Sequence, residues 1–228
     1  MMPESAVAGI VLLSLRVSAV AMLFAVPAAF AIAWVLARHD FYGKSVLQAL
    51  VTLPLVLPPV VTGYFLLILF GAGGPLGHLF DALGIDFAFR WTGAALAAAV
   101  MAFPLLVRPM RLSIEALDTG LEEAAATLGA GRITRFFTIT LPMVLPGVIA
   151  GGVLGFAKAL GEFGATITFV SNIPGETRTL SLAIYTMLQS PAGDGTMALL
   201  IAVSACLAIG SVLLSEWLGR RVDIRRRA

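Results

Sequence analysis

The chain has 228 residues, of which 59% are hydrophobic and 12% are charged, with a mean hydropathy of +0.98 and a formal net charge of +2. About a quarter of the residues of a water-soluble domain are charged, so this composition excludes a soluble enzyme and indicates an integral membrane protein. One cysteine, Cys206, excludes a disulfide framework. The two histidines, His39 and His78, have no zinc-type spacing, so neither a metal nor a cofactor is expected.

Five stretches are apolar over about 20 residues, the length that a helix needs to cross a bilayer. Their backbones must be helical, because hydrocarbon cannot satisfy free N–H and C=O groups. We therefore expect an all-α, polytopic membrane protein that forms one transmembrane domain over residues 1–228. The expected spans are about 15–37, 47–70, 92–113, 143–165 and 197–218.

Basic residues gather at three places along the chain, and cytoplasmic loops carry an excess of Lys and Arg. With five spans, this pattern places the N-terminus outside and the C-terminus in the cytoplasm. In the outer loops we expect a short helix near 76–83 and an interfacial or re-entrant segment over 179–190. The basic residues are Arg38 and Lys44, then Arg108, Arg111, Arg132 and Arg135, then Arg220, Arg221, Arg225, Arg226 and Arg227.

Prolines interrupt the second span, and proline removes a backbone hydrogen bond and kinks a helix. Pro54, Pro58 and Pro59 lie close together before Gly63, and Pro104 and Pro109 interrupt the third span. Such residues are often simply tolerated in membranes, but the freed carbonyls also suit a polar cavity. On the second reading, the candidate translocation path includes Thr52, Pro58, Pro59, Thr62 and Tyr64.

A polar segment over about 114–142 separates the third and fourth spans and is predicted to form a helical hairpin. Thr119 and Glu122 have capping-box spacing, an apolar face follows, and Gly129-Ala130-Gly131 ends the first helix. An amphipathic hairpin of this kind can lie flat on lipid headgroups or fill a groove on a partner. A DNA-binding reading fails because the membrane holds both ends of the hairpin, so no nucleic-acid partner is expected.

Lys158 and Glu162 are the charged pair of the fourth span. Being four residues apart, they share one helix face and can neutralise each other, either as a structural pair or as part of the translocation path. The same helix carries Gly147, Gly151 and Gly155 at intervals of four, which suits close helix packing within one chain or across a dimer.

The chain carries no recognisable energy source of its own. Gly43-Lys44-Ser45 matches only the end of a phosphate-binding loop, because Arg38 stands where the motif needs its first glycine. Serines in the apolar helices have no His or Asp partner at sensible reach. We therefore expect no enzyme activity, and any ATP hydrolysis must come from a separate subunit. An ion-gradient-driven secondary transporter is the alternative from another class, although five spans do not divide into two equal halves.

The hairpin resembles the EAA signature of bacterial ABC importer permeases. Glu123-Ala124-Ala125 is followed after three residues by Gly129, and after nine more by Ile139-x-Leu141-Pro142. The segments LPLVLPPVVTGY, TLGAGR, FFTITLP and LGEFGATITFVSNIPGETRT resemble the molybdate permeases of this family, with sulfate and thiosulfate permeases as near relatives and tungstate as a further possible cargo.

This resemblance implies a type I importer permease fold in the bacterial inner membrane. It further implies a homodimer, two copies of an ATP-binding subunit, and a periplasmic molybdate-binding protein that delivers the anion. The resemblance makes 114–142 the ATPase-coupling loop, with its candidate residues Glu122, Glu123, Ala124, Ala125, Gly129, Ile139, Leu141 and Pro142.

Overall fold

The computed structural model describes residues 4–189 and 194–227, and these residues form helices joined by loops. Among the described residues, four helices are long and apolar enough to cross a membrane, and a bent helix pair makes a fifth span if it is counted as one. The elements are α1 (Glu4–Arg38), α2 (Lys44–Val56), α3 (Pro59–Phe70), α4 (Pro75–Asp81), α5 (Trp91–Glu115), α6 (Thr119–Thr127), α7 (Arg132–Arg135), a π-helical turn η1 (Phe136–Thr140), α8 (Leu141–Leu160), α9 (Gly164–Val170), α10 (Leu180–Leu188) and α11 (Asp194–Arg227).

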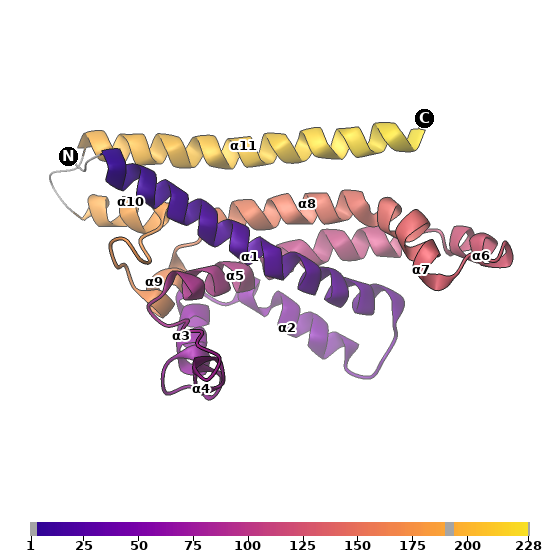
Figure 1. Ribbon diagram of the computed structural model, residues 1–228, viewed down its shortest axis with the longest axis horizontal. Helices are drawn as coiled ribbons and strands as arrows, with labels where there is room; N and C mark the ends of the chain where they lie inside the picture. The colour runs from indigo at the N-terminus through magenta and orange to yellow at the C-terminus, as the bar shows by residue number, and fades with distance from the viewer. Residues whose placement is uncertain (1–3, 190–193, 228) are drawn as a thin grey trace.

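The long helices α1, α5, α8 and α11 run along the longest axis of the molecule (Figure 1). α5 lies at the centre and packs against both α1 and α8, so it is the most buried of the candidate spans. Small residues make this contact close, since Ala94, Ala97, Ala98 and Ala102 on α5 are almost completely buried. The α6–α7 hairpin projects beyond one end of the bundle, and α9 and α10 lie toward the other end (Figure 1).

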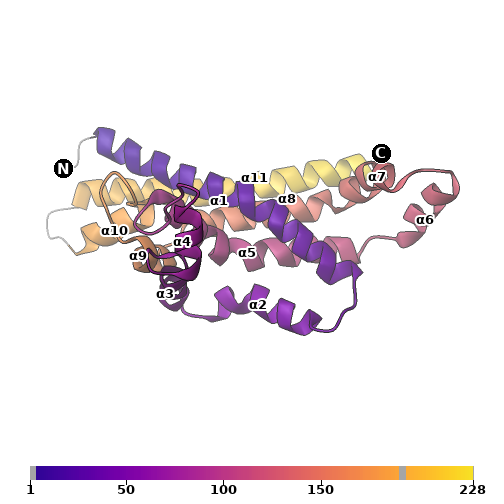
Figure 2. The same cartoon turned by 60° about the horizontal axis from the view of Figure 1, so that its bottom comes forward.

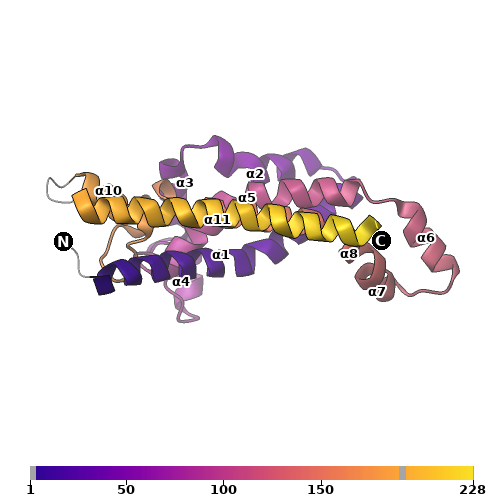
Figure 3. The same cartoon turned by 90° about the horizontal axis from the view of Figure 1, so that it is seen from above.

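The two ends of the described chain lie toward opposite ends of the long axis (Figure 3). α1 begins at Glu4, well before the expected start of the first span, and α11 extends from Asp194 to Arg227. α11 packs on α8 and α10 and is the least buried candidate span. The expected short outer helix is α4. The expected interfacial segment forms α10, whose Leu180, Leu182 and Ala183 are buried rather than laid out on a surface.

The second span is not one continuous helix. Its proline cluster interrupts it, as the sequence analysis predicted. The chain breaks at Leu57 and Pro58, and α2 and α3 are bent by 117° relative to each other. The break follows from proline chemistry, because Pro58 and Pro59 supply no backbone N–H to continue the ladder of α2. α2 therefore lies along the outside of the bundle with no buried residue, while α3 turns across it (Figure 2). The third span was also expected to be interrupted by its prolines, but α5 runs unbroken through Pro104 and Pro109.

The glycine row of the fourth span packs within the chain, against α5. A methyl group added at Gly151 would lie 2.9 Å from the carbonyl oxygen of Leu106, and one added at Gly155 would lie 2.6 Å from the Leu106 side chain. A methyl group added at Gly147 would come closer still to its neighbour, the Ser113 side chain. Only glycine permits this backbone approach, so the row holds α8 against α5. The question left open by the sequence is thereby answered in favour of intrachain packing.

Candidate functional site

The polar hairpin begins one residue earlier than its capping-box spacing predicted. The side chain of Asp118, rather than Thr119, caps α6 by accepting a hydrogen bond from the backbone N–H of Gly120 at 2.8 Å. Asp and Thr both favour this position, and the aspartate precedes the threonine in the chain. Glu122 is therefore not used for the reciprocal half of a capping box, and its carboxylate is free for other partners.

Gly129 ends α6 in a left-handed conformation with φ of 87°. The backbone N–H groups of Gly129 and Ala130 donate to the carbonyls of Ala126 and Ala125, both at 3.0 Å. These two bonds form a Schellman motif, which satisfies the last carbonyls of the helix and needs a residue that tolerates positive φ. The glycine of the EAA signature is thus explained by local backbone geometry.

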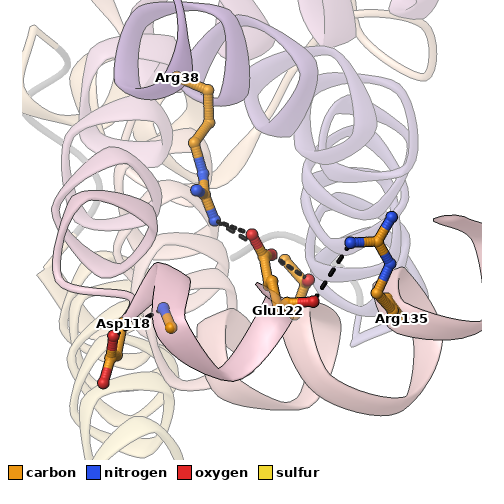
Figure 4. A network of polar contacts seen from close by, with 6 residues as sticks. Arg38, Asp118, Glu122 and Arg135 are labelled. Atoms are coloured by element: carbon orange, nitrogen blue, oxygen red, sulfur yellow. Dashed lines mark hydrogen bonds and ion pairs between the residues drawn. The ribbon is translucent and has the colours of Figure 1, made fainter. Parts of the chain in front are cut away.

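Glu122, on α6, is the centre of a polar network that joins this helix to α1, α7 and η1 (Figure 4). Arg38, at the end of α1, donates to both carboxylate oxygens of Glu122 at 3.1 Å. Thr140 donates its hydroxyl hydrogen to Oε1 of Glu122 at 2.5 Å, and Arg135 donates to the Glu122 backbone carbonyl at 3.2 Å. The Arg38 and Glu122 side chains are 19% and 21% exposed, so the pair is shielded from bulk water. The network fixes the hairpin to α1 and to the start of α8.

An aromatic cluster supports the same junction. Phe136 of the hairpin contacts Phe30 and Trp34 of α1 edge to face, with ring centroids 6.3 and 5.7 Å away. The guanidinium of Arg38 lies over the Trp34 ring, 5.3 Å from its centroid. Edge-to-face pairs and cation–π contacts each add about 0.5–1.5 kcal/mol, so the apolar and charged contacts reinforce each other.

The chain passes from the hairpin into α8 through the π-helical turn at Phe136–Thr140. Leu141 donates its N–H to the carbonyl of Phe136, one residue further back than in an α-helix. Pro142 follows and has no N–H to give, which favours a widened turn at this place. Single π-helical turns are frequent at functional sites. Ile139 and Leu141 are half-buried here and Pro142 is exposed.

The outward surface of the hairpin is apolar and open. Leu128 is 88% exposed and Ile133 is 77% exposed, and Leu121 and Phe137 are also exposed. Glu123 and Ala124 lie on exposed positions, and Ala125 is half-buried. The sequence analysis did not include Leu128, Arg38 or Thr140 among the candidate site residues, and it used Arg38 only as a cation that sets the topology. A lone arginine that ends an apolar helix was the available signal for Arg38, but nothing in the sequence pairs it with Glu122.

Lys158 and Glu162 form the ion pair that their spacing predicts, with Nζ and Oε2 2.5 Å apart. Glu162 is 3% exposed, and its other oxygen accepts the N–H of Ala165 at 3.0 Å. Glu162 therefore also satisfies a free donor at the start of α9, across the break at Gly161–Phe163. This second bond supports a structural role for the pair.

The break in the fourth span lies against the break in the second. A methyl group on Gly63 would be 2.5 Å from the Ala165 carbonyl oxygen, and one on Gly164 would be 2.7 Å from the Pro59 ring. α3 and α9 thus pack backbone to backbone next to Glu162. Within this contact, Thr62 is buried and its hydroxyl has no partner among the described residues.

The remaining path candidates do not join this contact. Pro58 is exposed at the start of α3, and Tyr64 is exposed on α3. Thr52 lies on α2, where its hydroxyl donates to the carbonyl of Gln48. Within residues 4–189 and 194–227, no three His, Cys, Asp or Glu side chains gather in a way that could hold a metal ion.

Known proteins resemble this chain over nearly its whole length. Residues 8–224 match the model of the family described as "Binding-protein-dependent transport system inner membrane component". The "Molybdenum transport system permease protein ModB" of Escherichia coli K12 is 59% identical over 211 residues, which cover 92% of each chain. The "Sulfate transport system permease protein CysT" of Salmonella typhimurium is 38% identical over 193 residues, covering 83% of this chain and 70% of that protein.

Solved structures share the fold at low identity. A bacterial ABC transporter that imports the acidic polysaccharide alginate matches with a TM-score of 0.72 and 20% identity, covering 94% of this chain and 79% of that chain. A second alginate transporter structure, in complex with a periplasmic protein bound to an alginate pentasaccharide, also has a TM-score of 0.72, at 19% identity over 94% of this chain and 78% of that chain. The chain belongs to the family of inner membrane components of binding-protein-dependent transport systems.

Proposed function

We propose that this chain is the membrane-spanning subunit of an ATP-driven importer, which carries molybdate from a periplasmic binding protein into the cytoplasm by alternating access. The observation that carries the proposal is the 59% identity, over 92% of both chains, to a permease named for molybdenum transport. ATP hydrolysis belongs to a separate subunit. In this chain Lys44, the first residue of α2, pairs at 2.7 Å with Asp40 of the preceding loop instead of closing a phosphate-binding loop.

The α6–α7 hairpin is the surface that receives the ATP-binding subunits, one on each permease of a homodimer. Its projection beyond the bundle and its exposed apolar side chains suit a groove on a partner. Glu123, Ala124 and Gly129 are exposed and available to that partner, whereas Glu122 is turned toward Arg38. We assign docking to the exposed residues and positioning of the hairpin to Glu122.

The hairpin end of the molecule then faces the cytoplasm, so the N-terminus is outside and the C-terminus inside the cell. The opposite end, with α4 and α10, faces the periplasmic binding protein. The alginate transporter, whose fold this chain shares, was solved with a periplasmic protein bound. Multi-pass insertion in the bacterial inner membrane follows from the family and from the apolar helices.

Sulfate is the second candidate cargo, because a sulfate permease is 38% identical over 83% of this chain. Thiosulfate and tungstate share the same anionic chemistry. An ion-gradient-driven secondary transporter stays the alternative from another class, and family membership favours the ATP-driven importer over it.

Reconstitution tests the function directly. The permease is assembled with its ATP-binding subunit in vesicles, and uptake of labelled molybdate is measured with the binding protein present. Uptake is expected only with ATP, to persist with a protonophore, and to resist a tenfold excess of sulfate. Uptake driven by an ion gradient without ATP would contradict the importer, and efficient competition by sulfate would reassign the cargo.

A further inference from the structure

A cavity of about 460 Å³ opens between α2 and α5, toward the hairpin end of the molecule. It begins beside Leu36, near the end of α1, and continues along Gln48 and Thr52 of α2. The facing wall belongs to α5, from Pro104 to Glu115. No residue of α6 or α7 lines it, and neither does the contact between α3 and α9 beside Glu162, so the cavity is separate from both.

The polar groups of this cavity are arranged by an arginine. Arg111 donates from Nε to Oε1 of Glu115 at 2.7 Å and from NH1 to Oε1 of Gln48 at 3.0 Å. The second bond uses the carbonyl oxygen of the Gln48 amide as acceptor, so the amide N–H groups are left as donors. Thr52 lines the cavity, but its hydroxyl hydrogen is engaged by the Gln48 backbone carbonyl at 2.5 Å.

Arg108 supplies the uncompensated charge. The charge of Arg111 is offset by Glu115, whereas Arg108 has no carboxylate at ion-pair distance among the residues that the structure describes. Arg108 is exposed and lies seven residues before the end of α5, about 10 Å along the helix. A charge at such a depth is unfavourable against lipid and suits a water-filled cavity or an anionic ligand.

We propose that this cavity is an oxyanion site on the exit side of the translocation path, with Arg108, Arg111 and Gln48 as its donors. This inference rests on the proposed function of oxyanion import. Guanidinium groups match oxyanions in two-point hydrogen bonds, and three side chains here present N–H groups to one space. Glu115 weakens the attraction for an anion, which fits a path where each site must also release its ligand.

Thiol labelling from the hairpin side tests the charge of the cavity. Cys206 is the only cysteine, so the variant C206A leaves T52C as a single reporter, with L55C as a second reporter if T52C is poorly expressed. In the full transporter, each reagent's rate is divided by its rate with a small free thiol, and on this scale the anionic sulfonatoethyl methanethiosulfonate is expected to react about tenfold faster than its trimethylammonium counterpart, from the attraction of one nearby cation. Millimolar molybdate is expected to slow this labelling, and R108Q to remove both effects.

Uptake in vesicles gives the second readout. R108Q is expected to lower molybdate uptake about tenfold at subsaturating molybdate, while ATP hydrolysis stimulated by the binding protein continues. R108K keeps the charge and is expected to retain the preference for the anionic reagent. K44Q is the matched control, because it removes a cation from the same end of the molecule but outside the cavity.

Each outcome separates the site from the import function. Equal labelling by both reagents, after division by their rates with the free thiol, or molybdate protection that persists in R108Q, overturns the site even if wild type imports molybdate. Protection that depends on Arg108 supports the site even if wild type imports nothing, in which case the import function fails. A headgroup phosphate could use the same donors. Unchanged uptake in R108Q, together with loss of bound anionic lipid, would assign Arg108 to lipid and overturn the proposal.

Discussion

Replacing Glu122 by Gln is predicted to loosen the hairpin from α1 without unfolding the bundle. The wild-type carboxylate accepts from Arg38 through both oxygens at 3.1 Å and from Thr140 at 2.5 Å. Glutamine keeps one oxygen for Thr140 but presents an NH2 group in place of the other. It therefore loses the charge and one of the two acceptors that face the guanidinium, while the size of the side chain is unchanged.

The magnitude follows from the burial of the pair. A hydrogen bond to a charged group contributes about 1.5–3 kcal/mol, and solvent screening at the partly exposed Arg38–Glu122 pair lowers this to about 1–2 kcal/mol. At about 1.4 kcal/mol for each tenfold, the open population of the hairpin should rise about five- to thirtyfold. Local opening of this kind is measured by amide hydrogen exchange.

The assay is hydrogen exchange of the purified permease, read on peptides that cover 119–128. Glu122→Gln should speed exchange there by that factor and leave peptides from α5 unchanged. Glu123→Gln is the matched control, since the neighbouring carboxylate lies at an exposed position outside the network. Exchange at the wild-type rate in Glu122→Gln, or equal acceleration in both variants, would refute the role of the Glu122 network in holding the hairpin. A double variant with Arg38→Gln should be no faster than Glu122→Gln alone.

Three further predictions test the turn, the helix seam and the ion pair. Gly129→Val should destabilise the end of α6 by about 1–2 kcal/mol more than Gly129→Asn, because asparagine tolerates positive φ and valine does not. Gly129→Val should also lower uptake per ATP, and equal uptake in the two variants would contradict the strain argument. Gly151→Val should lower the melting temperature of the permease, while Gly152→Val, whose added methyl meets nothing within 4 Å, should not. Equal melting temperatures would show that the packing of the glycine row against α5 does not contribute to stability. Lys158→Met should slow uptake and lower the melting temperature, because it leaves the Glu162 carboxylate buried without its cation. Adding Glu162→Gln should restore the melting temperature, and no rescue would contradict a structural pair.

The sequence predicted the long elements of the fold well, because each depends on a local pattern. Apolar runs located α1, α5, α8 and α11, and the proline cluster marked the interruption after α2. The sharpness of that bend was not predictable, since proline permits a kink without setting its angle. Pro104 and Pro109 show the same limit, because α5 continues through both.

Contacts between residues far apart in the sequence could not be predicted from it. The spacing of Lys158 and Glu162 predicted their pairing, because four residues make one helical turn. Arg38 and Glu122 are 84 residues apart, and only the packing of α1 against the hairpin brings them together. The glycine row could have packed within the chain or across a dimer, because its spacing does not identify the neighbouring helix. The position of α5 decided in favour of packing within the chain.

These contacts give the hairpin a direct connection to the whole length of α8. The hairpin runs through η1 into α8 without a loop, and the glycine row holds α8 against the backbone of α5. At its far end α8 carries Lys158 and Glu162, next to the contact between α3 and α9. A hinge at the π-helical turn would absorb the motion locally, and the Arg38–Glu122–Thr140 network opposes such a hinge. Under the proposed importer function, we expect ATP hydrolysis by the partner subunit to continue when this network is broken, while less of the motion reaches the helix breaks.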